Sequence, residues 1–494
     1  MPLLKKVSTG RVRARRVSVP SLEYRRRASS IASGPVVNDV HSQLNRTRVS
    51  RIAEPGSVEA LQAIVRTARR LGEQVSVAGG RHAMGGQQFG TDALLVDMSA
   101  MNRMLGFDAG RRLVEVEAGI RWPELIERLR EAQSGCPEQY GIIQKQTGAD
   151  ALSLGGALAA NIHGRGLSLK PIIGDVESFV LVDAEGQLRR CSRSENAELF
   201  RLAIGGYGLF GIIASVRLRL APRRRLRRIV EVADLWECLP AFEQRIEDGF
   251  LYGDFQFMTD SESPHFLRRG VFSCYRPVTG EADGTETRAE LSPGDWRQLL
   301  YLAHADRRQA FDVYSQHYLS TSGQLYWSDT HQLSTYVDDY HRELDARLGA
   351  RAPGSEMITE VYLPREHLAA FMETTREDFR AARTELIYGT IRLIERDDES
   401  FLAWARERYA CVVFNLHVTH DGPGLEKAAR DFRRLIDRAI RYGGSYYLTY
   451  HRWATRAQVE SCYPQLPEFL RLKRRYDPAE TFQSDWYRHY KRMF

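Results

Sequence analysis

Residues 75–87 read Val-Ser-Val-Ala-Gly-Gly-Arg-His-Ala-Met-Gly-Gly-Gln, and they are the most informative part of the sequence. It places a short β-branched strand before a glycine-rich turn that carries His82. Glycine has no Cβ atom, so successive backbone N–H groups in such a turn approach a pyrophosphate closely and form a concave anion site. The stretch therefore predicts a phosphate-bearing cofactor with a histidine beside it. A surface loop with an idle histidine is the alternative reading of this motif taken alone.

The flanking sequence predicts alternating helices and strands. Ser57 to Leu71 has an N-capping serine, an apolar stripe and a following glycine, which is typical of a helix. A second helix is expected near Pro123, a helical segment at 195–204 and a long helix at 428–442. Strands are expected at 74–78, 93–98, 114–118, 179–183, 187–191, 212–221, 356–364 and 411–418.

A second segment of small residues, Ser153-Leu-Gly-Gly-Ala-Leu-Ala-Ala-Asn-Ile-His-Gly164, contains six Gly or Ala residues. Such composition lets the backbone lie against a flat ring or against another backbone. A tightly packed helix with a buried His163 explains it equally well.

Residues 206–211, Gly-Tyr-Gly-Leu-Phe-Gly, match the dinucleotide pattern G-x-G-x-x-G. That fingerprint requires a strand before it and a helix after it, so that the pyrophosphate meets a helix N-terminus. Here a helical segment precedes the glycines and a strand follows. The sequence therefore predicts that this is not a Rossmann fold.

The charge of the chain is concentrated at its N-terminus. The 494 residues have a formal net charge of +7, of which residues 1–34 carry +8 and residues 35–494 carry −1. A nearly neutral body argues against an enzyme that works on nucleic acid. We expect the basic arm to be disordered, and either inert or a targeting or surface-binding segment. No stretch approaches the ~20 apolar residues of a membrane span.

The six cysteines are scattered and include no Cys-x-x-Cys pair, so neither a disulfide framework nor a zinc site is expected. A reducing compartment, most simply the cytoplasm, fits this usage. His417 and His420 make a poor metal pair because residues three apart on a strand point to opposite faces. We therefore expect no metal site, although His417 alone remains a candidate for lining an active site.

Together these segments resemble the flavin-linked oxidases of the vanillyl-alcohol oxidase and p-cresol methylhydroxylase superfamily. The motifs that carry the resemblance are, in chain order, the turn with His82, Thr147–Gly164, Gly205–Ile213 and Tyr476–Asp485. The Ile162-His163-Gly164 ending and residues 443–469 are most similar to the branch of alditol and aldonolactone oxidases and decaprenylphosphoryl-ribose 2-oxidases.

The resemblance implies an α+β fold with an FAD-binding domain of the p-cresol methylhydroxylase (PCMH) type and a separate mixed α/β substrate (cap) domain built on an antiparallel sheet. The charged run Arg223–Arg228 suggests the boundary between them. The expected parts are a disordered arm (1–34), the FAD-binding domain (35–225), the substrate domain (226–475) and a C-terminal segment that returns to the FAD-binding domain (476–494).

The resemblance also implies FAD as cofactor, attached covalently through His82 to the 8α carbon of the flavin. Thr147–Leu154 has no cysteine, so a single attachment is expected. The residues expected to bind the cofactor are Gly79, Gly80, Arg81, His82, Ala83, Gly86, Gln87, Thr147, Gly148, Ser153, Gly155, Gly156, Asn161, His163, Gly164, Gly211, Ile213 and Asp485.

The implied reaction is oxidation of a CH–OH group of a polyol, sugar, aldonolactone or glycosyl substrate by hydride transfer to flavin N5. Arg392 lies in a segment that resembles the Glu-x-Arg of the polyol oxidases, with Thr390 in place of the glutamate. The candidates for catalysis are Arg392, Tyr450, His451, His417, His163 and Glu360. The alternatives are a flavin-dependent C=C reductase or dehydrogenase on a lipid or sterol-like substrate, and a non-catalytic flavin-binding protein. Oxygen, a quinone or another acceptor would take the electrons.

Overall fold

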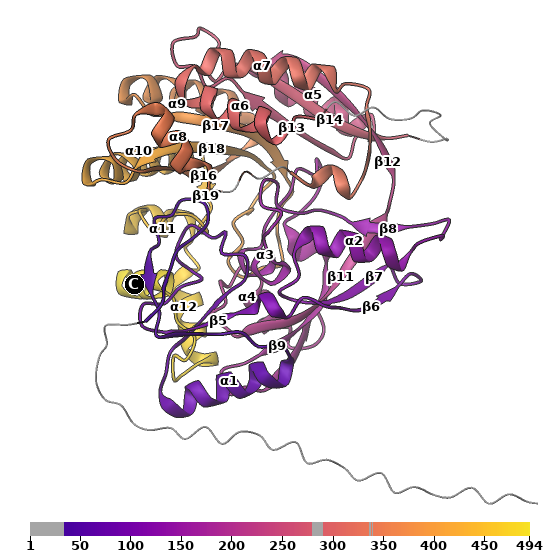
Figure 1. Ribbon diagram of the computed structural model, residues 1–494, viewed down its shortest axis with the longest axis vertical. Coiled ribbons are helices and arrows are strands. Elements are labelled where there is room, and N and C mark those ends of the chain that lie inside the picture. Colours follow the sequence, from indigo (N-terminus) through magenta and orange to yellow (C-terminus); the bar gives the residue numbers. More distant parts are fainter. Residues whose placement is uncertain (1–33, 279–289, 335–336, 338) are drawn as a thin grey trace, which may run out of the picture. The chain divides into compact units, whose positions relative to one another are not determined.

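The computed structural model describes residues 34–278, 290–334, 337 and 339–494. Predictions about residues 1–33 therefore fall outside the described part of the chain. Residues Pro35–Phe494 form one compact unit. Two sheets organise this unit, and each is accompanied by its own helices (Figure 1).

The first sheet is antiparallel and has the strand order β10-β9-β11-β7-β6, with β8 pairing to β11. Its strands are β6 (Met104–Asp108), β7 (Leu113–Glu117), β8 (Tyr140–Ile142), β9 (Val176–Val182), β10 (Leu188–Ser192) and β11 (Ile212–Pro222). A parallel sheet of β3 (Arg51–Ala53), β5 (Leu94–Asp97) and β4 (Val75–Ala78) and a two-stranded ribbon of β1 (Val36–Val37) and β2 (Thr47–Arg48) accompany it. The helices of this half are α1 (Val58–Leu71), α2 (Trp122–Ala132), α3 (Leu154–Ala160) and α4 (Ala197–Ala203), with 3-10 turns η1 (Met98–Ala100) and η2 (Ile172–Asp175).

The predicted elements of this half are confirmed. The Ser57 side chain accepts a hydrogen bond from the backbone N–H of Ala60, and Gly72 ends α1 with a φ of +66°. The predicted strands and the hairpin of β9 and β10 are present, and α2 begins one residue before Pro123. The glycines at 206–211 lie between α4 and β11, so the exclusion of a Rossmann fold is also confirmed.

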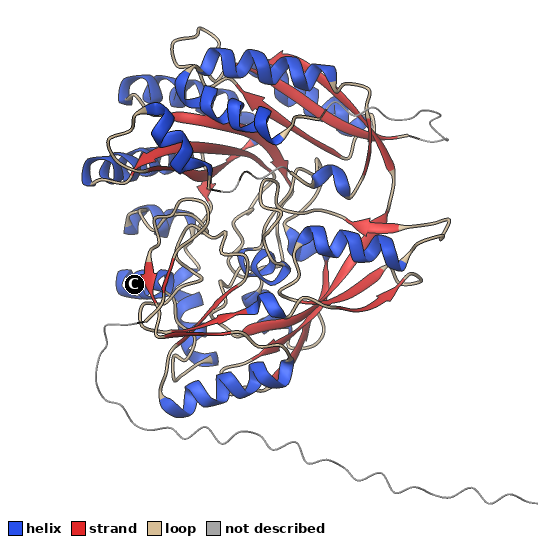
Figure 2. Cartoon of the chain, viewed as in Figure 1, coloured by secondary structure: helices blue, strands red, loops and turns tan. Residues whose placement is uncertain are grey.

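The second sheet has eight strands in the order β15-β12-β14-β13-β17-β18-β16-β19, all of them antiparallel (Figure 2). They are β12 (Arg225–Asp234), β13 (Tyr252–Phe257), β14 (Arg269–Pro277), β15 (Leu325–Trp327), β16 (Gly354–Pro364), β17 (Leu386–Ile394), β18 (Tyr409–Thr419) and β19 (Ser445–Tyr446). The helices around it are α5 (Leu235–Glu247), α6 (Pro293–Ala305), α7 (Arg307–Ser320), α8 (Tyr340–Leu348), α9 (Leu368–Ala382) and α10 (Gly422–Arg441), with η3 (Thr330–Gln332) and η4 (Arg365–His367).

The two faces of this sheet have different environments. On one face, the Phe414 ring of β18 packs against Phe371 and Phe379 of α9, and α10 contacts β16 and β18. On the other face, α7 contacts β12 and β14. Side chains of α6 and α7 line a cavity there, so this second face is the one that meets the site described below.

The run Arg223–Arg228 contains the start of β12 at Arg225, and the Arg225 guanidinium lies 4.8 Å from the Trp327 ring centre. One sequence prediction needs correction. The long helix begins at Gly422 and not at 428. The Asp421 side chain caps it by accepting from the Gly424 N–H, and Pro423 occupies its first turn, where the missing N–H costs nothing.

The C-terminal part contains α11 (Arg456–Cys462), α12 (Leu466–Tyr476) and α13 (Asp485–Met493). Between the last two helices, Phe482 forms a parallel bridge to Val75 of β4. The Val75 N–H donates to the Thr481 carbonyl at 2.7 Å, and the Gln483 N–H donates to the Val75 carbonyl at 2.8 Å. The end of the chain thus extends the parallel sheet beside the glycine turn.

A buried ion pair organises this return. Lys473 and Asp477 are almost fully buried, and their Nζ and Oδ2 atoms lie 2.6 Å apart. Asp477 also accepts hydrogen bonds from the Thr481 and Phe482 N–H groups at 2.9 and 2.8 Å. We expect Asp477→Ala to lower the free energy of unfolding by about 3–5 kcal/mol, because it leaves a buried ammonium without a partner.

Denaturant midpoints of the flavin-loaded protein test this expectation. Glu468→Ala is the matched control, since it breaks the exposed Glu468–Arg471 pair on the same helix. The control should leave the midpoint almost unchanged. Equal midpoints for Asp477→Ala and the wild type would contradict the assignment.

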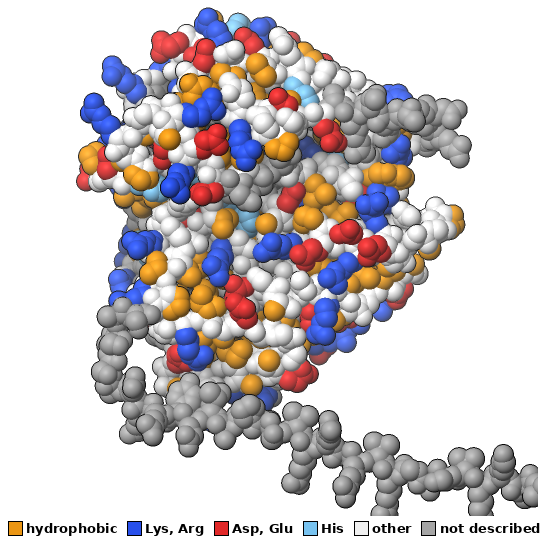
Figure 3. Space-filling model, viewed as in Figure 1, with side chains coloured by type: hydrophobic (Ala, Val, Ile, Leu, Met, Phe, Trp, Pro, Cys, Tyr) orange, Lys and Arg blue, Asp and Glu red, His pale blue; other side chains and the backbone are white. Residues whose placement is uncertain are grey.

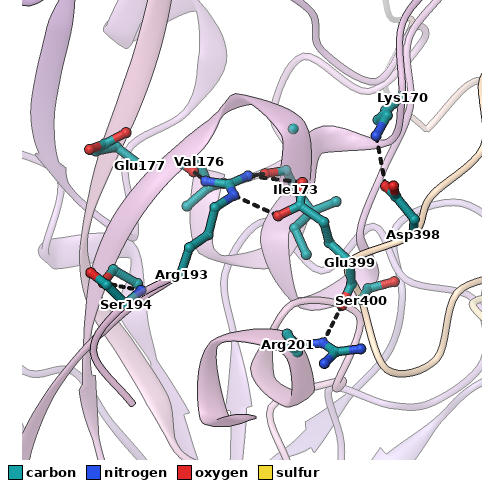
Figure 4. Close-up of polar contacts among 12 residues, drawn as sticks. Lys170, Ile173, Val176, Glu177, Arg193, Ser194, Arg201, Asp398, Glu399 and Ser400 are labelled. Carbon is teal, nitrogen blue, oxygen red and sulfur yellow. Dashed lines mark hydrogen bonds and ion pairs between the residues drawn. The ribbon is translucent and has the colours of Figure 1, made fainter. Parts of the chain in front are cut away.

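The loop between β17 and β18 is fastened to the first half by ion pairs (Figure 4). Arg193 donates to Glu399 at 2.6 Å and to the Val176 and Ile173 carbonyls at 2.7 and 2.9 Å. Lys170 pairs with Asp398 at 2.7 Å. The contacts of Arg193 with Glu399 and of Lys170 with Asp398 therefore join the loop of the second sheet to the first half of the unit, which is distant in sequence.

Charge on the surface is mixed. On the face drawn in Figure 3, Lys and Arg side chains are interspersed with Asp and Glu side chains and do not form one basic patch. Among the described helices, none combines the length and the apolar character that a bilayer span requires. All six cysteines are described, and all are free thiols.

Candidate active site

The two glycine tracts meet, and their packing requires glycine. A Cβ atom on Gly80 would lie 2.1 Å from the Ala151 carbonyl oxygen, and one on Gly79 would lie 2.0 Å from Ser153 Oγ. A Cβ on Gly155 would approach the Cβ of Ala118 to 2.9 Å. The turn after β4 and the start of α3 therefore contact each other backbone to backbone, as the small residues predicted.

A cavity of about 840 Å³ opens along these tracts. Its volume lies within the range of small-molecule sites, about 300–1,000 Å³. It is lined by residues of both halves of the compact unit and by α6 and α7. Of the expected cofactor residues, those on its wall are Gly79, Gly80, Arg81, His82, Ala83, Gln87, Thr147, Gly148, Ser153, Gly155, Gly156, Gly211 and Ile213.

The other expected cofactor residues are not on this wall and have other contacts. Asn161 donates to Asp397 at 2.9 Å and accepts from the Ile173 N–H, which fixes the end of α3. Asp485 accepts from the Thr91 N–H and hydroxyl. His163 and Gly164 lie behind the wall, where the His163 Nδ1 atom is 3.0 Å from the Gly164 carbonyl oxygen. Gly86 faces Asn45 and Arg452.

His82 is a neutral, buried imidazole on the cavity wall. Its Nδ1 atom lies 2.8 Å from Nε2 of His41. Burial, followed by the nearby His41, Arg121 and Lys145, lowers the pKa of His82 to about 3. At neutral pH the ring therefore carries a nitrogen lone pair, which is the form that acts as a nucleophile.

Glu360 is the centre of a buried polar cluster at the opposite wall. Its Oε2 atom lies 3.1 Å from His163 Nε2 and accepts from the Tyr362 hydroxyl at 2.9 Å, while its Oε1 atom accepts from the Tyr450 hydroxyl at 2.8 Å. Burial opposes ionisation, but the interactions with His163, Arg392 and Tyr450 prevail and lower the pKa of Glu360. The cluster thus holds a carboxylate at neutral pH.

Tyr450 is the weaker candidate for a base. Burial, and then the neighbouring Glu360 carboxylate, raise the pKa of Tyr450 well above its usual value. Its hydroxyl already donates to that carboxylate. At neutral pH Tyr450 is therefore a hydrogen-bond donor and not a tyrosinate.

Arg392 presents unused donors to the same region. It is 4% exposed and lines the cavity, and its Nε and Nη1 atoms are buried without a hydrogen-bond partner among the described residues. A buried donor that makes no hydrogen bond costs free energy of folding. Such donors in a cavity wall indicate that a bound ligand accepts hydrogen bonds from them.

Strand register explains why these groups share one surface. Gln256, Thr390, Val413 and Glu360 form one row across β13, β17, β18 and β16. Residues two positions away on the same strands, among them Asp254 and Arg392, face the same way. Gln256, Val413 and Glu360 of this row line the cavity together with Asp254 and Arg392, and they form its polar wall.

Several wall residues were missed by sequence reasoning, namely Arg165, Asp254, Gln256, Asn415, Arg228 and Gln88. Unpaired buried atoms occur here too: Asp254 Oδ1, Gln256 Oε1 and Asn415 Oδ1 have no hydrogen-bond partner among the described residues. The signal that could have found them is a polar residue at every second position of an otherwise apolar strand, as in Asp254-Phe-Gln256.

Besides His163, two catalytic candidates lie off the cavity wall. The His451 ring stacks on Trp453 at 4.5 Å between ring centres. His417 lies farther along β18, with Nδ1 4.0 Å from Glu356 Oε1, while the His420 Nε2 atom is 2.7 Å from Ser355 Oγ. His417 and His420 therefore do not act together, as their spacing predicted.

These features fit an FAD molecule. The wall at the glycine tracts includes many glycine and alanine residues, which leave room for a ring or a pyrophosphate, and a Cβ on Gly148 (φ +79°) would meet only open space. The Oε1 atoms of Gln87, Gln88 and Gln146 are buried beside it without a partner among the described residues. Such acceptors suit the N–H and hydroxyl groups of an isoalloxazine and a ribityl chain.

Comparison with known proteins identifies the class. Residues 49–192 match the family described as FAD binding domain. The chain therefore contains an FAD binding domain.

Individual relatives lie in the branch that the motifs suggested. L-gulonolactone oxidase of Bos taurus is 29% identical over 195 residues, which cover 39% of this chain and 42% of that protein. Decaprenylphosphoryl-beta-D-ribose oxidase of Mycolicibacterium smegmatis is 23% identical over 440 residues, 86% of this chain and 91% of that protein. L-gulono-1,4-lactone dehydrogenase of Mycobacterium tuberculosis is 22% identical over 449 residues, 89% and 95% of the two chains.

Proposed function

We propose that this protein oxidises a CH–OH group of a sugar-derived lactone, a polyol or a glycosyl compound. The observation that carries the proposal is the cavity itself, with the glycine tracts and His82 on one side and Glu360, Tyr450 and Arg392 on the other. Its relatives are named as oxidases or dehydrogenases of gulonolactone and of a ribose derivative, which supports such a substrate.

FAD, when bound, supplies the acceptor of a hydride from the substrate carbon. Gly79, Gly80, Gly155 and Gly156 would hold it, and the neutral ring of His82 would form the covalent bond. The covalent bond between the flavin and His82 is supported by the lowered pKa of His82 and by its position on the cavity wall.

The side chains of the polar wall have separate tasks. The Glu360 carboxylate accepts the proton of the substrate hydroxyl, and His163 and Tyr450 hold its oxygens in place. The unpaired Arg392 donors bind the substrate oxygen and stabilise the charge that develops on it, with little reorganisation because the guanidinium is already fixed. Binding fixes the reacting carbon and excludes water.

Anaerobic bleaching of the flavin absorbance tests this function without assuming an electron acceptor. The purified holoenzyme is mixed with aldonolactones, polyols and glycosides, and with the matching deoxy compounds as controls. We expect bleaching by at least one hydroxylated compound and by none of its deoxy counterparts. Bleaching only by compounds that lack a CH–OH group would overturn the proposal, and the acceptor is then found by adding oxygen or a quinone.

A further inference from the structure

A second group of titratable side chains lies outside the cavity, at the far end of β16 and β18. Glu356 of β16 pairs with His417 of β18, four residues along the strand from Glu360. His304 of α6 and His341 of α8 reach the same carboxylate. The Glu356 side chain is 5% exposed, and the three histidines are 5–16% exposed.

The spacing of three of these groups suits a metal ion. The ligand atoms offered by His304, Glu356 and His417 all lie within 4.8 Å of one another. Glu356 Oε1 is 2.9 Å from His304 Nε2 and 4.0 Å from His417 Nδ1. Ligands about 2.0–2.2 Å from a tetrahedral zinc ion are about 3.4 Å apart, and the observed separations bracket that value.

The hydrogen-bonding roles of the rings point the same way. His304 Nδ1 lies 2.8 Å from the Leu300 carbonyl oxygen, which can only accept, so this nitrogen carries the hydrogen. Nε2 is then the ring nitrogen that faces Glu356 Oε1, and a ring that donates its other N–H to a carbonyl oxygen has the arrangement usual for metal-binding histidines. His417 Nδ1 is buried near the same oxygen and has no hydrogen-bond partner among the described residues.

Neighbouring groups hold the three side chains in this arrangement. The second carboxylate oxygen, Oε2, accepts from the Tyr340 hydroxyl and lies 3.1 Å from His341 Nε2, so Oε1 is the oxygen that faces His304 and His417. The bond from His304 to the Leu300 carbonyl is the kind of contact that orients metal-binding histidines. A Cβ atom on Gly354 would lie 2.4 Å from His417 Cε1, so glycine makes room for this ring.

We propose that His304 Nε2, Glu356 Oε1 and His417 Nδ1 bind one divalent transition-metal ion, and Zn²⁺ is among the ions that two imidazoles and one carboxylate suit. The ion ties α6 to β16 and β18. Because Leu299, Leu300 and Ala303 of α6 line the cavity, the ion also fixes one wall of the active site. The site is separate from the proposed reaction and does not depend on it.

Metal analysis of the holoenzyme tests the proposal. The tag-free, flavin-loaded protein is stripped with a chelator, dialysed and titrated with Zn²⁺ by calorimetry. We expect one ion per chain with a Kd in the micromolar range or below, and a higher Tm in the presence of Zn²⁺. Co²⁺ as a probe should give visible bands of a low-symmetry site at wavelengths beyond the flavin absorption.

Variants locate the ion. His304→Ala and His417→Ala should each weaken Zn²⁺ binding by at least 100-fold, and Glu356→Gln should do so with little change in side-chain shape. His367→Ala is the matched control, since it removes an exposed histidine of the same half and should leave Zn²⁺ affinity unchanged.

Two results would overturn the proposal. One is a folded wild-type holoenzyme that takes up no Zn²⁺ or Co²⁺ below 100 µM, which would make the cluster a proton-linked histidine–carboxylate group. The other is Zn²⁺ binding that all three ligand variants retain, which would place the ion elsewhere. Neither measurement uses substrate turnover, so failure here and failure of the proposed oxidation are distinguishable.

Discussion

Replacement of Arg392 by methionine is expected to lower kcat by about 10²–10³-fold while the flavin spectrum stays intact. This decrease in kcat is typical of removing one preorganised hydrogen-bond donor from a site where charge develops in the transition state. Methionine keeps most of the length of the side chain and removes the guanidinium, so the cavity wall keeps its shape. Because two of the donors of Arg392 have no partner among the described residues, the change breaks few internal hydrogen bonds.

The kinetic pattern separates a catalytic role from simple binding. A loss in kcat at nearly constant KM means that the interaction forms in the transition state, whereas a rise in KM alone means uniform binding. Arg396→Met is the matched control, because this arginine follows the same strand but is exposed. Unchanged kcat and KM for Arg392→Met would remove the arginine from the mechanism.

Replacement of His82 by alanine is expected to abolish covalent retention of the flavin. After acid precipitation the yellow chromophore of the wild type should remain with the chain, and that of the variant should appear in the supernatant. The physical reason is that the pKa of His82, lowered to about 3, leaves a neutral nucleophilic ring on the cavity wall at neutral pH. Loss of the bond should also lower the reduction potential of the flavin that remains bound.

His367→Ala serves as the histidine control and should retain the chromophore, because this side chain is exposed. Release of flavin from the acid-treated wild type would refute the covalent bond and leave the FAD binding domain standing. Retention in His82→Ala would assign the bond to another residue.

Local patterns predicted the elements of the first half well. The capping serine and terminal glycine of α1 and the alternation in β7 and β11 are short-range signals, and the structure has all of them. The glycine tracts could be predicted because close contact between backbones requires glycine, and clusters of glycine are easily recognised in a sequence. The start of α10 was missed since Gly422 and Pro423 are usually helix breakers, and only the cap by Asp421 makes them a first turn.

The site could be predicted only where a motif marked it. His82, Glu360, Arg392 and Tyr450 lie on the cavity wall, but His417 and His451 do not. Asp254 and Gln256 join the wall through the pairing of β13 with β17, whose strands are more than 120 residues apart in sequence. The cluster around Glu356 collects side chains from α6, α8, β16 and β18, and no spacing along the chain reveals such a meeting.

The bridge between Phe482 and Val75 has a consequence for how the polypeptide matures. During synthesis β4 emerges early, but the strand that covers its open edge is made about 400 residues later. Until the ribosome finishes, this edge stays available for pairing with other chains, a known hazard of nascent sheets. We therefore expect a chain that is truncated before residue 481 to aggregate more readily than the full chain.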